Sequence, residues 1–287
     1  MNPQIKKVAY YIETHLDDEL DIMVLAKVAG YSHFHFCRIF KVSVGESVMS
    51  YTTRLRLERA SSKLYREKKK SMIEVALDAG YKTPTGFIKA FKSRFGTTPT
   101  AYKSSVKELR NRYKDIDMNS PKIVTRDEAY VVFTRELGGY MTSSEIAWKR
   151  LSEKMNGLRK QFEERPPKSE IYLEKGNAEA IGICHDDPQV TDEANIRYDA
   201  SLAWGKKEVE ILADYGFETK IIAGGKYAKV LYEGGYKDAE KAWYGLYAWI
   251  EENGYSFRDE PAFEKYLNMP EEVDEAELLT EIYVPIV

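Results

Sequence analysis

The segment Leu25-Ala-Lys-Val-Ala-Gly-Tyr31 recurs fifty residues later as Val75-Ala-Leu-Asp-Ala-Gly-Tyr81. The similarity continues beyond these segments, because a Phe-Lys pair, a glycine and a tyrosine follow each copy in the same order, at residues 40–41, 45 and 51 and at residues 91–92, 96 and 102. One structural unit therefore occurs twice, with a single-residue change of length.

Each copy predicts a helix, a tight turn and a second helix. Gly30 and Gly80 suit the left-handed position that ends a helix. The next helix then begins at a capping residue, which is Ser32 in the first copy and Thr83, followed by Pro84, in the second. This arrangement is typical of DNA-reading domains, whose second helix enters the major groove, although a single copy can also be a structural hairpin.

Two further helices are predicted around the copies. Apolar residues at three- and four-residue steps indicate an amphipathic helix after Asn2-Pro3: Ile5, Val8, Ile12 and Leu16. Residues 46–67 contain no helix breaker and predict one connecting helix. About 20 residues span roughly 30 Å, close to the roughly 34 Å between successive major-groove faces. One chain can thus fill two adjacent major grooves of double-stranded DNA without dimerising.

The formal net charge of −3 hides an uneven distribution. Residues 1–114 contain 22 Lys and Arg against 11 Asp and Glu, a net charge of +11, which leaves −14 for the remainder. A basic segment of this size favours a polyanionic partner such as nucleic acid, and a solvated charged surface is the alternative. We predict an all-α DNA-binding domain over residues 1–112, a linker over 113–121 and a second domain over 122–287.

Composition excludes several classes of protein. With 43% hydrophobic and 31% charged residues the chain is not disordered, and without an apolar run of about 18 residues or a signal peptide we expect a cytoplasmic protein that does not contact membranes. Two cysteines, Cys37 and Cys184, give no disulfide framework. His33 and Cys37 share a helix face but have no further ligands in reach, so we expect neither metal nor cofactor. Residues 68–70, three lysines, predict a solvated loop that can contact phosphate.

Residues 29–41 and 79–103 resemble the two recognition segments of the AraC family of bacterial transcription regulators. The Phe-Lys, Phe-Gly-x-Thr-Pro and Tyr landmarks fall in register over about residues 3–105. The resemblance implies a DNA-contacting surface made of residues from both second helices: Ser32, His33, Phe34, Cys37, Arg38, Thr83, Pro84, Thr85, Gly86 and Lys89.

Arg38 is the strongest candidate for direct readout, because its planar fork can donate to both acceptors of a guanine. Lys89 can reach a base or a phosphate. Pro84 and Gly86 have no donor side chain, so we expect the second helix to rely more on phosphate contact and DNA shape. Phe34 is either a core aromatic or a contact to a thymine methyl group.

The acidic half also contains a repeated pattern. Residues 129–140 and 226–236 each predict a strand that ends in Gly-Gly-Tyr and precedes a helix containing Ala-Trp, at 147–148 and 242–243. Further short strands are predicted after each helix: residues 180–184 and 196–204, then 263–267 and 279–285. We therefore predict an α+β domain with an internally duplicated strand-helix-strands unit and a cleft between the copies.

Aligning the two copies places Asp199 opposite Glu281 in equivalent strands. The two-residue period of a strand places Glu281 with Tyr283 on one face, and Glu264 with Tyr266 on one face of the preceding strand. A carboxylate among aromatic rings suits a cationic, lipophilic ligand. The alternative is that Glu281 is exposed to solvent on an open sheet face or fixes a backbone amide.

Residues 182–188, 197–200, 264–267 and 280–286 resemble the GyrI-like effector-binding domain, over about residues 122–287. In that family, and in similar domains of drug-sensing regulators, acidic and aromatic side chains line a central cavity. The match implies ligand-binding residues on these strands, with three weaker additions: Glu264, Tyr266, Glu281 and Tyr283, then Trp204, Tyr140 and Tyr236. Some GyrI-like domains are hydrolases, but no Ser-His-Asp or Cys-His pattern is present here, so we expect no enzyme.

The order of the two domains resembles the Rob-like subgroup of the AraC family. It implies a sequence-specific regulator in which a small-molecule effector alters DNA occupancy or contact with RNA polymerase. Two alternatives remain at this stage. One is an architectural protein without sequence preference, and the other is a sequestering or hydrolytic GyrI-like protein fused to a DNA-binding module.

Overall fold

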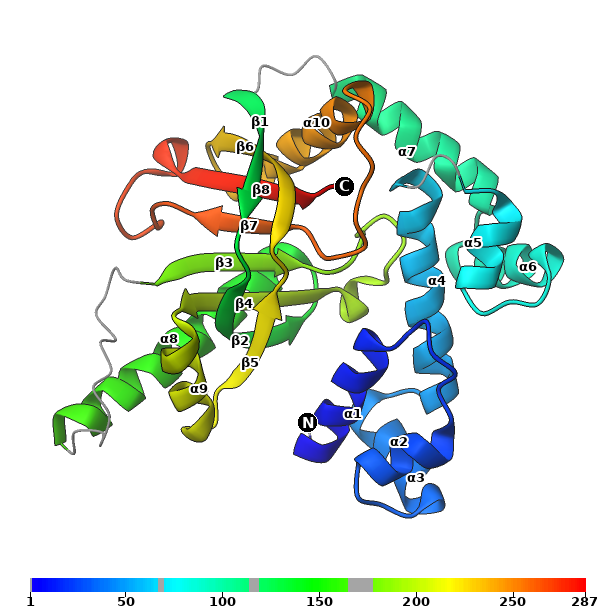
Figure 1. Ribbon diagram of the computed structural model, residues 1–287, viewed down its shortest axis with the longest axis horizontal. Helices are drawn as coiled ribbons and strands as arrows, with labels where there is room; N and C mark the ends of the chain where they lie inside the picture. Colours follow the sequence, from blue (N-terminus) through cyan, green and yellow to red (C-terminus); the bar gives the residue numbers. More distant parts are fainter. Residues whose placement is uncertain (1, 67–69, 114–118, 165–177) are drawn as a thin grey trace. The chain divides into compact units, whose positions relative to one another are not determined.

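The computed structural model describes residues 2–66, 70–113, 119–164 and 178–287. They form two compact units, Met1–Val106, here the helical unit, and Lys107–Val287, here the sheet unit. Both are drawn in Figure 1. Within the described residues no helix is long and apolar enough to cross a membrane.

The helical unit contains the predicted repeat. Its helices, the last of which continues into the sheet unit, are α1 Pro3–Thr14, α2 Ile22–Val28, α3 His33–Val44, α4 Val48–Arg66, α5 Met72–Asp78, α6 Pro84–Phe95 and α7 Pro99–Tyr113. Gly30 and Gly80 adopt the predicted left-handed backbone, with φ of 69° and 78°. Asn2 caps α1 by accepting the Gln4 N–H at 2.9 Å, and Thr83 caps α6.

The two copies also share their core positions. Phe36 and Phe40 of α3 are fully buried with ring centroids 5.7 Å apart, and Phe87 and Phe91 of α6 are fully buried with centroids 5.6 Å apart. These side chains lie one helical turn apart, so one face of each second helix packs inward and the opposite face stays available to a partner.

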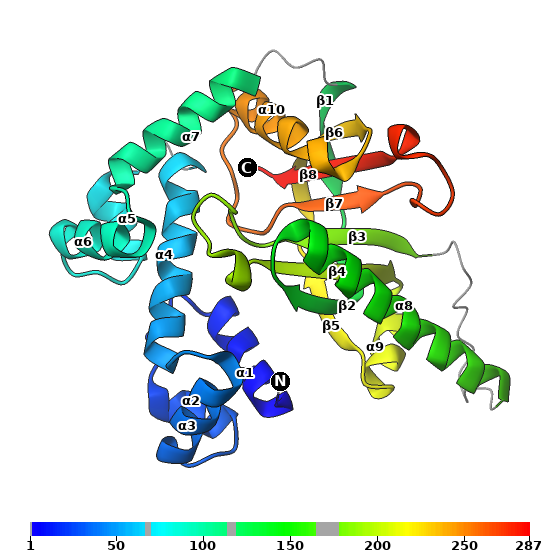
Figure 2. The same cartoon turned by 180° about the vertical axis from the view of Figure 1, so that it is seen from behind.

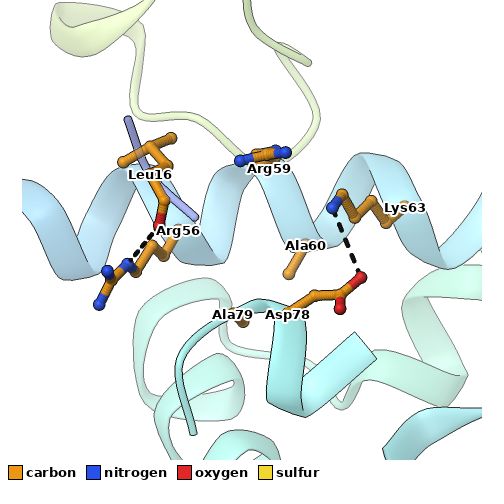
Figure 3. Close-up of a pocket in the computed structure, with 7 residues that line it drawn as sticks. All are labelled: Leu16, Arg56, Arg59, Ala60, Lys63, Asp78 and Ala79. Carbon is orange, nitrogen blue, oxygen red and sulfur yellow. Dashed lines mark hydrogen bonds and ion pairs between the residues drawn. The ribbon is translucent and has the colours of Figure 1, made fainter. Parts of the chain in front are cut away.

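Helix α4 lies between the α2–α3 pair and the α5–α6 pair (Figure 1). Its basic side chains bind the segment that follows α1 and the second copy, as Figure 3 shows for Leu16 and Asp78. Arg56 donates to the carbonyl oxygens of Leu16 at 3.0 Å and Asp18 at 2.8 Å, and Lys63 lies 3.5 Å from Asp78. Part of the positive charge counted in the sequence is therefore structural.

The sheet unit is α+β, as predicted. Its strands and α-helices are β1 Asn119–Arg126, β2 Ala129–Leu137, α8 Tyr140–Glu164, β3 Glu179–Cys184, β4 Arg197–Trp204, α9 Lys206–Asp214, β5 Glu218–Ile222, β6 Gly225–Glu233, α10 Ala239–Glu252, β7 Phe263–Tyr266 and β8 Leu279–Pro285. Three single turns of 3₁₀-helix complete it: Glu193–Asn195, Tyr236–Asp238 and Glu275–Glu277. The strands form one antiparallel sheet in the order β1-β6-β8-β7-β3-β4-β2-β5.

The two faces of this sheet are covered differently. Helices α8 and α10 lie against one face (Figure 2), over two apolar clusters. Strands β1 and β5 cross the other face (Figure 1), over a cluster that includes Val131, Tyr227, Phe263 and Tyr283. The boundary between the two predicted copies falls between β3, which belongs to the first copy, and β7, which belongs to the second. The origin of the copies by duplication stays a prediction.

Three elements were not predicted: β1, α9 and β5. Strand β1 begins at Asn119, inside the predicted linker, and α7 extends to Tyr113, whereas residues 114–118 lie outside the described part of the chain. Strands β1 and β5 form the two edges of the sheet, and their many polar residues obscure the strand pattern. The units divide between Val106 and Lys107, ahead of the predicted linker.

Candidate DNA-binding and effector sites

The recognition helices α3 and α6 expose the side chains best suited to reading DNA. Phe34 is 85% exposed, so the interpretation of this residue as a core aromatic is wrong. Arg38 of α3 and both Thr85 and Lys89 of α6 are exposed as well. An arginine, a lysine and an apolar ring are residue types that contact guanine, phosphate and thymine methyl groups in protein–DNA complexes.

The other residues predicted to contact DNA either precede the first turn of α3 or α6 or are half-buried. Ser32 is exposed and its side chain makes no capping bond, whereas the Thr83 hydroxyl accepts the Gly86 N–H at 3.2 Å. Three more are half-buried: His33, Cys37 and Pro84. Gly86 is half-buried as well. Lys68 and Lys69 lie outside the described residues, and Lys70 pairs with Asp78 at 2.7 Å.

In the sheet unit, hydrogen bonds from both covering helices converge on Glu264. Trp243 Nε1 of α10 donates to Glu264 Oε1 at 2.9 Å, and the Tyr266 hydroxyl donates to Oε2 at 2.6 Å. The hydroxyls of Tyr198 and Tyr266 are 2.9 Å apart, and Trp148 Nε1 of α8 donates to Tyr198 at 2.9 Å. Because Tyr266 gives its proton to Glu264, Tyr198 donates to Tyr266, and every donor in the chain points toward the carboxylate.

Gly182 makes this network possible. It lies on β3 directly opposite Glu264 of β7. A Cβ atom at this position would lie 2.4 Å from the hydroxyl oxygens of both Tyr198 and Tyr266. Only a glycine therefore lets the two hydroxyls meet above the centre of the sheet.

The Glu264 carboxylate is buried without a countercharge. The residue is 9% exposed, and no basic side chain in the described part of the chain pairs with it. Burial raises the pKa of Glu264, against the lowering effect of the bonds from Tyr266 and Trp243. Aromatic rings and two donors surround the charge, so the arrangement is suited to receiving a cation.

Glu281 and Tyr283, predicted to share this site, lie on the opposite face of the sheet. The register places Ile282 opposite Glu264 and Lys265 opposite Glu281. Glu281 also has a partner already, because Lys229 lies 2.6 Å from it. Burial opposes ionisation of Glu281, but Lys229 and the Tyr283 hydroxyl lower its pKa below the ordinary value. The prediction of one site containing both carboxylates is wrong.

Asp199, aligned with Glu281 in the sequence, is fully buried on that same opposite face. It is bound by Arg135 at 2.6 Å, by His185 at 2.7 Å and by Lys220. Burial would raise the pKa of Asp199, but Lys220 and Arg135 hold it well below its ordinary value. Burial lowers the pKa of His185 to about 4, so the imidazole is neutral at pH 7. This cluster is an internally paired structural group.

The three weaker candidates for ligand binding, Tyr236, Tyr140 and Trp204, lie in different surroundings. The Tyr236 ring packs against Tyr266, with centroids 5.6 Å apart, and is next to the network. The Tyr140 hydroxyl is fixed by the backbone of Asp186, and its ring lies 6.3 Å from Tyr198. Ala200 of β4 lies level with Glu264 across β3. Trp204 lies four residues further along β4, a distance of roughly 13 Å. Trp204 is half-buried and packs against the apolar cluster that includes Leu151 and Tyr198.

Sequence reasoning missed several members of the network: Trp148, Tyr198, Trp243 and Gly182. A signal was present for the two tryptophans, because both copies carry Ala-Trp after the Gly-Gly-Tyr motif. Their spacing places them on helices, but it does not show that the indole N–H groups face the sheet.

Helix α10, which carries Trp243 of the network, also contacts α7. Within the sheet unit, Arg110 of α7 is buried against α10 and pairs with Glu251 at 2.5 Å. Its guanidinium lies over the Tyr247 ring, and Tyr113 stacks on Tyr244 at 5.9 Å. The helix that carries Trp243 thus also holds the last turns of α7.

Comparison with known proteins agrees with both halves of this description. Residues 119–287 match the GyrI-like small molecule binding domain, and residues 25–105 match a helix-turn-helix domain. The Right origin-binding protein of Escherichia coli (strain K12) is 26% identical over 243 residues, which cover 80% of this chain and 78% of that protein.

Two further similarities cover one unit each. The regulatory protein SoxS of Escherichia coli (strain K12) is 30% identical over 99 residues, 34% of this chain and 92% of that protein. The crystal structure of the EcmrR C-terminal domain is 20% identical with a TM-score of 0.45, covering 58% of this chain and 97% of that one. The GyrI-like match alone spans more than half of the sequence. The chain therefore belongs to the family of GyrI-like small molecule binding domains, with an AraC-type helix-turn-helix DNA-binding domain ahead of it.

Proposed function

We propose that this protein is a sequence-specific transcription regulator in which residues 1–112 read DNA and residues 122–287 bind a lipophilic cation. The observation that carries the effector proposal is Glu264, a buried carboxylate that receives hydrogen bonds from Trp243 and Tyr266 and pairs with no described basic residue. The exposed side chains of α3 and α6 support the DNA-reading proposal.

A cation at Glu264 would relieve an electrostatic cost. An ionised carboxylate taken out of water loses several kcal/mol of solvation, and two donors offset only part of that loss. A cation without N–H groups suits the surroundings, because the donors present serve the carboxylate and the remaining surface is aromatic. Two rings beside the carboxylate are those of Trp243, which donates to it, and Trp148, which packs against Tyr266.

Effector binding would reach α7 through α10. A cation that shares Glu264 with Trp243 acts on the same helix that binds Arg110 through Glu251. We infer that this changes DNA occupancy or contact with RNA polymerase. The effector must favour one arrangement of α10 over another for such coupling to exist.

The effector proposal is tested with tetraphenylphosphonium and isothermal titration calorimetry on the full chain. Glu264→Gln removes the negative charge and keeps the size of the side chain. We expect the affinity to fall at least 10-fold, because a charge pair in an aromatic site contributes about 2 kcal/mol or more. Glu281→Gln is the matched control and should bind as the wild type does. Equal affinity in wild type and Glu264→Gln would refute the assignment.

The DNA-reading proposal is tested by gel-shift selection from random duplexes, with and without tetraphenylphosphonium. A regulator selects a defined sequence, and its occupancy changes with the effector. Binding with a steep salt dependence but no selected sequence would favour an architectural protein. Turnover of a small molecule in the absence of DNA would favour the hydrolytic alternative.

A further inference from the structure

The two halves of the sheet differ at the positions beside Glu264. Residues separated by 82 in number correspond, so Gly182 corresponds to Glu264 and Tyr198 to Thr280. In the first half the large side chain of Tyr198 reaches Tyr266. In the second half Thr280 is small, and its buried hydroxyl oxygen has no hydrogen-bond partner, although the residue is only 1% exposed.

Thr280 faces the same side of the sheet as Glu264. On β8 it lies directly opposite Tyr266 of β7 and Tyr232 of β6, while Ile282 lies opposite Glu264. Thr280 and Glu264 are therefore diagonal neighbours, at a typical separation of about 7–8 Å.

Neither neighbouring tyrosine hydroxyl serves Thr280. The Tyr232 hydroxyl donates to the Gly235 carbonyl at 2.9 Å, and the Tyr266 hydroxyl donates to Glu264. A buried polar group without a hydrogen bond destabilises a folded protein, and such groups are few in native structures. An orphan hydroxyl beside an unpaired carboxylate indicates a ligand that contacts both.

Tyr236 is the side chain that can make room for such a ligand. Its ring packs against Tyr266, and its hydroxyl has no hydrogen-bond partner among the residues that the structure describes. Tyr140, in the corresponding Gly-Gly-Tyr motif, donates to the Asp186 carbonyl at 2.5 Å and accepts the Asp186 N–H at 2.9 Å. Tyr236 can therefore turn away without breaking a hydrogen bond, whereas Tyr140 is fixed by two.

We propose that the effector binds in the second half only, where it replaces the Tyr236 ring against Tyr266, with its cationic centre at Glu264 and a hydrogen-bonding group on the Thr280 hydroxyl. The inference rests on the cation site proposed above and adds a second recognition point. It defines the effector class as lipophilic cations that carry a hydroxyl, carbonyl or amide group about 7–8 Å or less from the positive centre.

The test compares tetraphenylphosphonium with (4-hydroxyphenyl)triphenylphosphonium, which adds one hydroxyl, by calorimetry on the full chain. We expect the hydroxylated cation to bind about 3- to 10-fold more tightly, the range of one net hydrogen bond. Thr280→Val keeps the shape of the side chain and should abolish this preference while leaving the affinity for tetraphenylphosphonium unchanged.

Ser201→Ala is the matched control. The Ser201 hydroxyl is also buried without a partner, but Ser201 pairs with Phe133 and Ile181 and faces the opposite side of the sheet from Glu264. This variant should keep the preference. Tyr236→Ala should tighten binding of both cations, because no ring has to be displaced, and weaker binding of both would overturn the displacement.

The outcomes separate the two proposals. If both cations depend on Glu264 but Thr280→Val keeps the wild-type preference, or if the wild type shows no preference, the Thr280 contact is wrong and the cation site stands. If the wild type binds neither phosphonium, cation sensing fails and the inference fails with it.

Discussion

The helical unit and the sheet unit present their functional groups in opposite ways. Arg38, Phe34 and Lys89 project from helix surfaces whose other face is already packed. Glu264 is buried inside the sheet unit, in a hydrogen-bond network that contains four aromatic side chains. An exposed surface can change its specificity without changing the fold. In a buried site, the groups that would bind a ligand also pack in the core, so a substitution that changes binding can change stability as well.

The largest effect that tests this comparison is expected at Gly182. In Gly182→Val the new side chain meets the hydroxyls of Tyr198 and Tyr266, since a Cβ alone would lie 2.4 Å from each. We expect the free energy of unfolding of the sheet unit to fall by about 3 kcal/mol, the upper end for overpacking. Urea denaturation followed by tryptophan fluorescence measures this change.

A second glycine provides the control for Gly182→Val. Gly157 is exposed on α8, and a Cβ there would meet no atom within 4 Å. Gly157→Ala should raise the stability by about 0.5–1 kcal/mol, because alanine favours the helix. If Gly182→Val unfolds at the wild-type urea concentration, the hydroxyl pair is not a fixed part of the core.

The next effect concerns the exposed surface. Arg38→Ala should lose about 2 kcal/mol of affinity for the selected operator, about 30-fold, as expected for a lost base contact. Its free energy of unfolding should stay within about 0.5 kcal/mol of the wild type. Fluorescence anisotropy with labelled duplexes and urea denaturation measure the two quantities.

Arg56→Ala supplies the contrast within the same helical unit. Arg56 donates to the carbonyls of Leu16 and Asp18, so its loss should lower the stability. Equal unfolding energies for the Arg38 and Arg56 variants would contradict the division of basic residues into DNA-reading and structural ones.

The smallest effect is a pH dependence of stability at Glu264. Its pKa is raised in the folded protein, so its contribution to stability is full below the unfolded pKa and is lost as the pH rises through the folded pKa. Glu264→Gln should therefore be more stable than the wild type at pH 8, by about 1 kcal/mol. The difference should shrink as the pH falls toward 4, which thermal unfolding across this range can follow.

Glu281 should behave in the opposite sense. Its pKa is lowered by Lys229, so its contribution is present above the unfolded pKa and is lost as the pH falls through the folded pKa. Glu281→Gln should be less stable than the wild type at neutral pH. The same sign for both variants would show that the two carboxylates do not differ in environment as described.

The sequence predicts the helical unit well because its signals are local. Gly30, Gly80 and Thr83 act within one turn of the chain, and the structure confirms their predicted roles. The proposed effector site depends on pairing between distant strands. The two-residue period groups Glu264 with Tyr266 and Glu281 with Tyr283, but it does not show which face of one strand continues onto the next.

The central strand pair limits how much negative charge the proposed effector site can hold. The middle pair of the sheet, β3 and β7, sets Gly182 directly against Glu264, so on this face the pair has one carboxylate, opposite a position without a side chain. Two buried carboxylates facing each other there would compete for a single proton. A chain with one negative charge on its midline binds one monovalent cation, and effector binding should saturate at one molecule per chain.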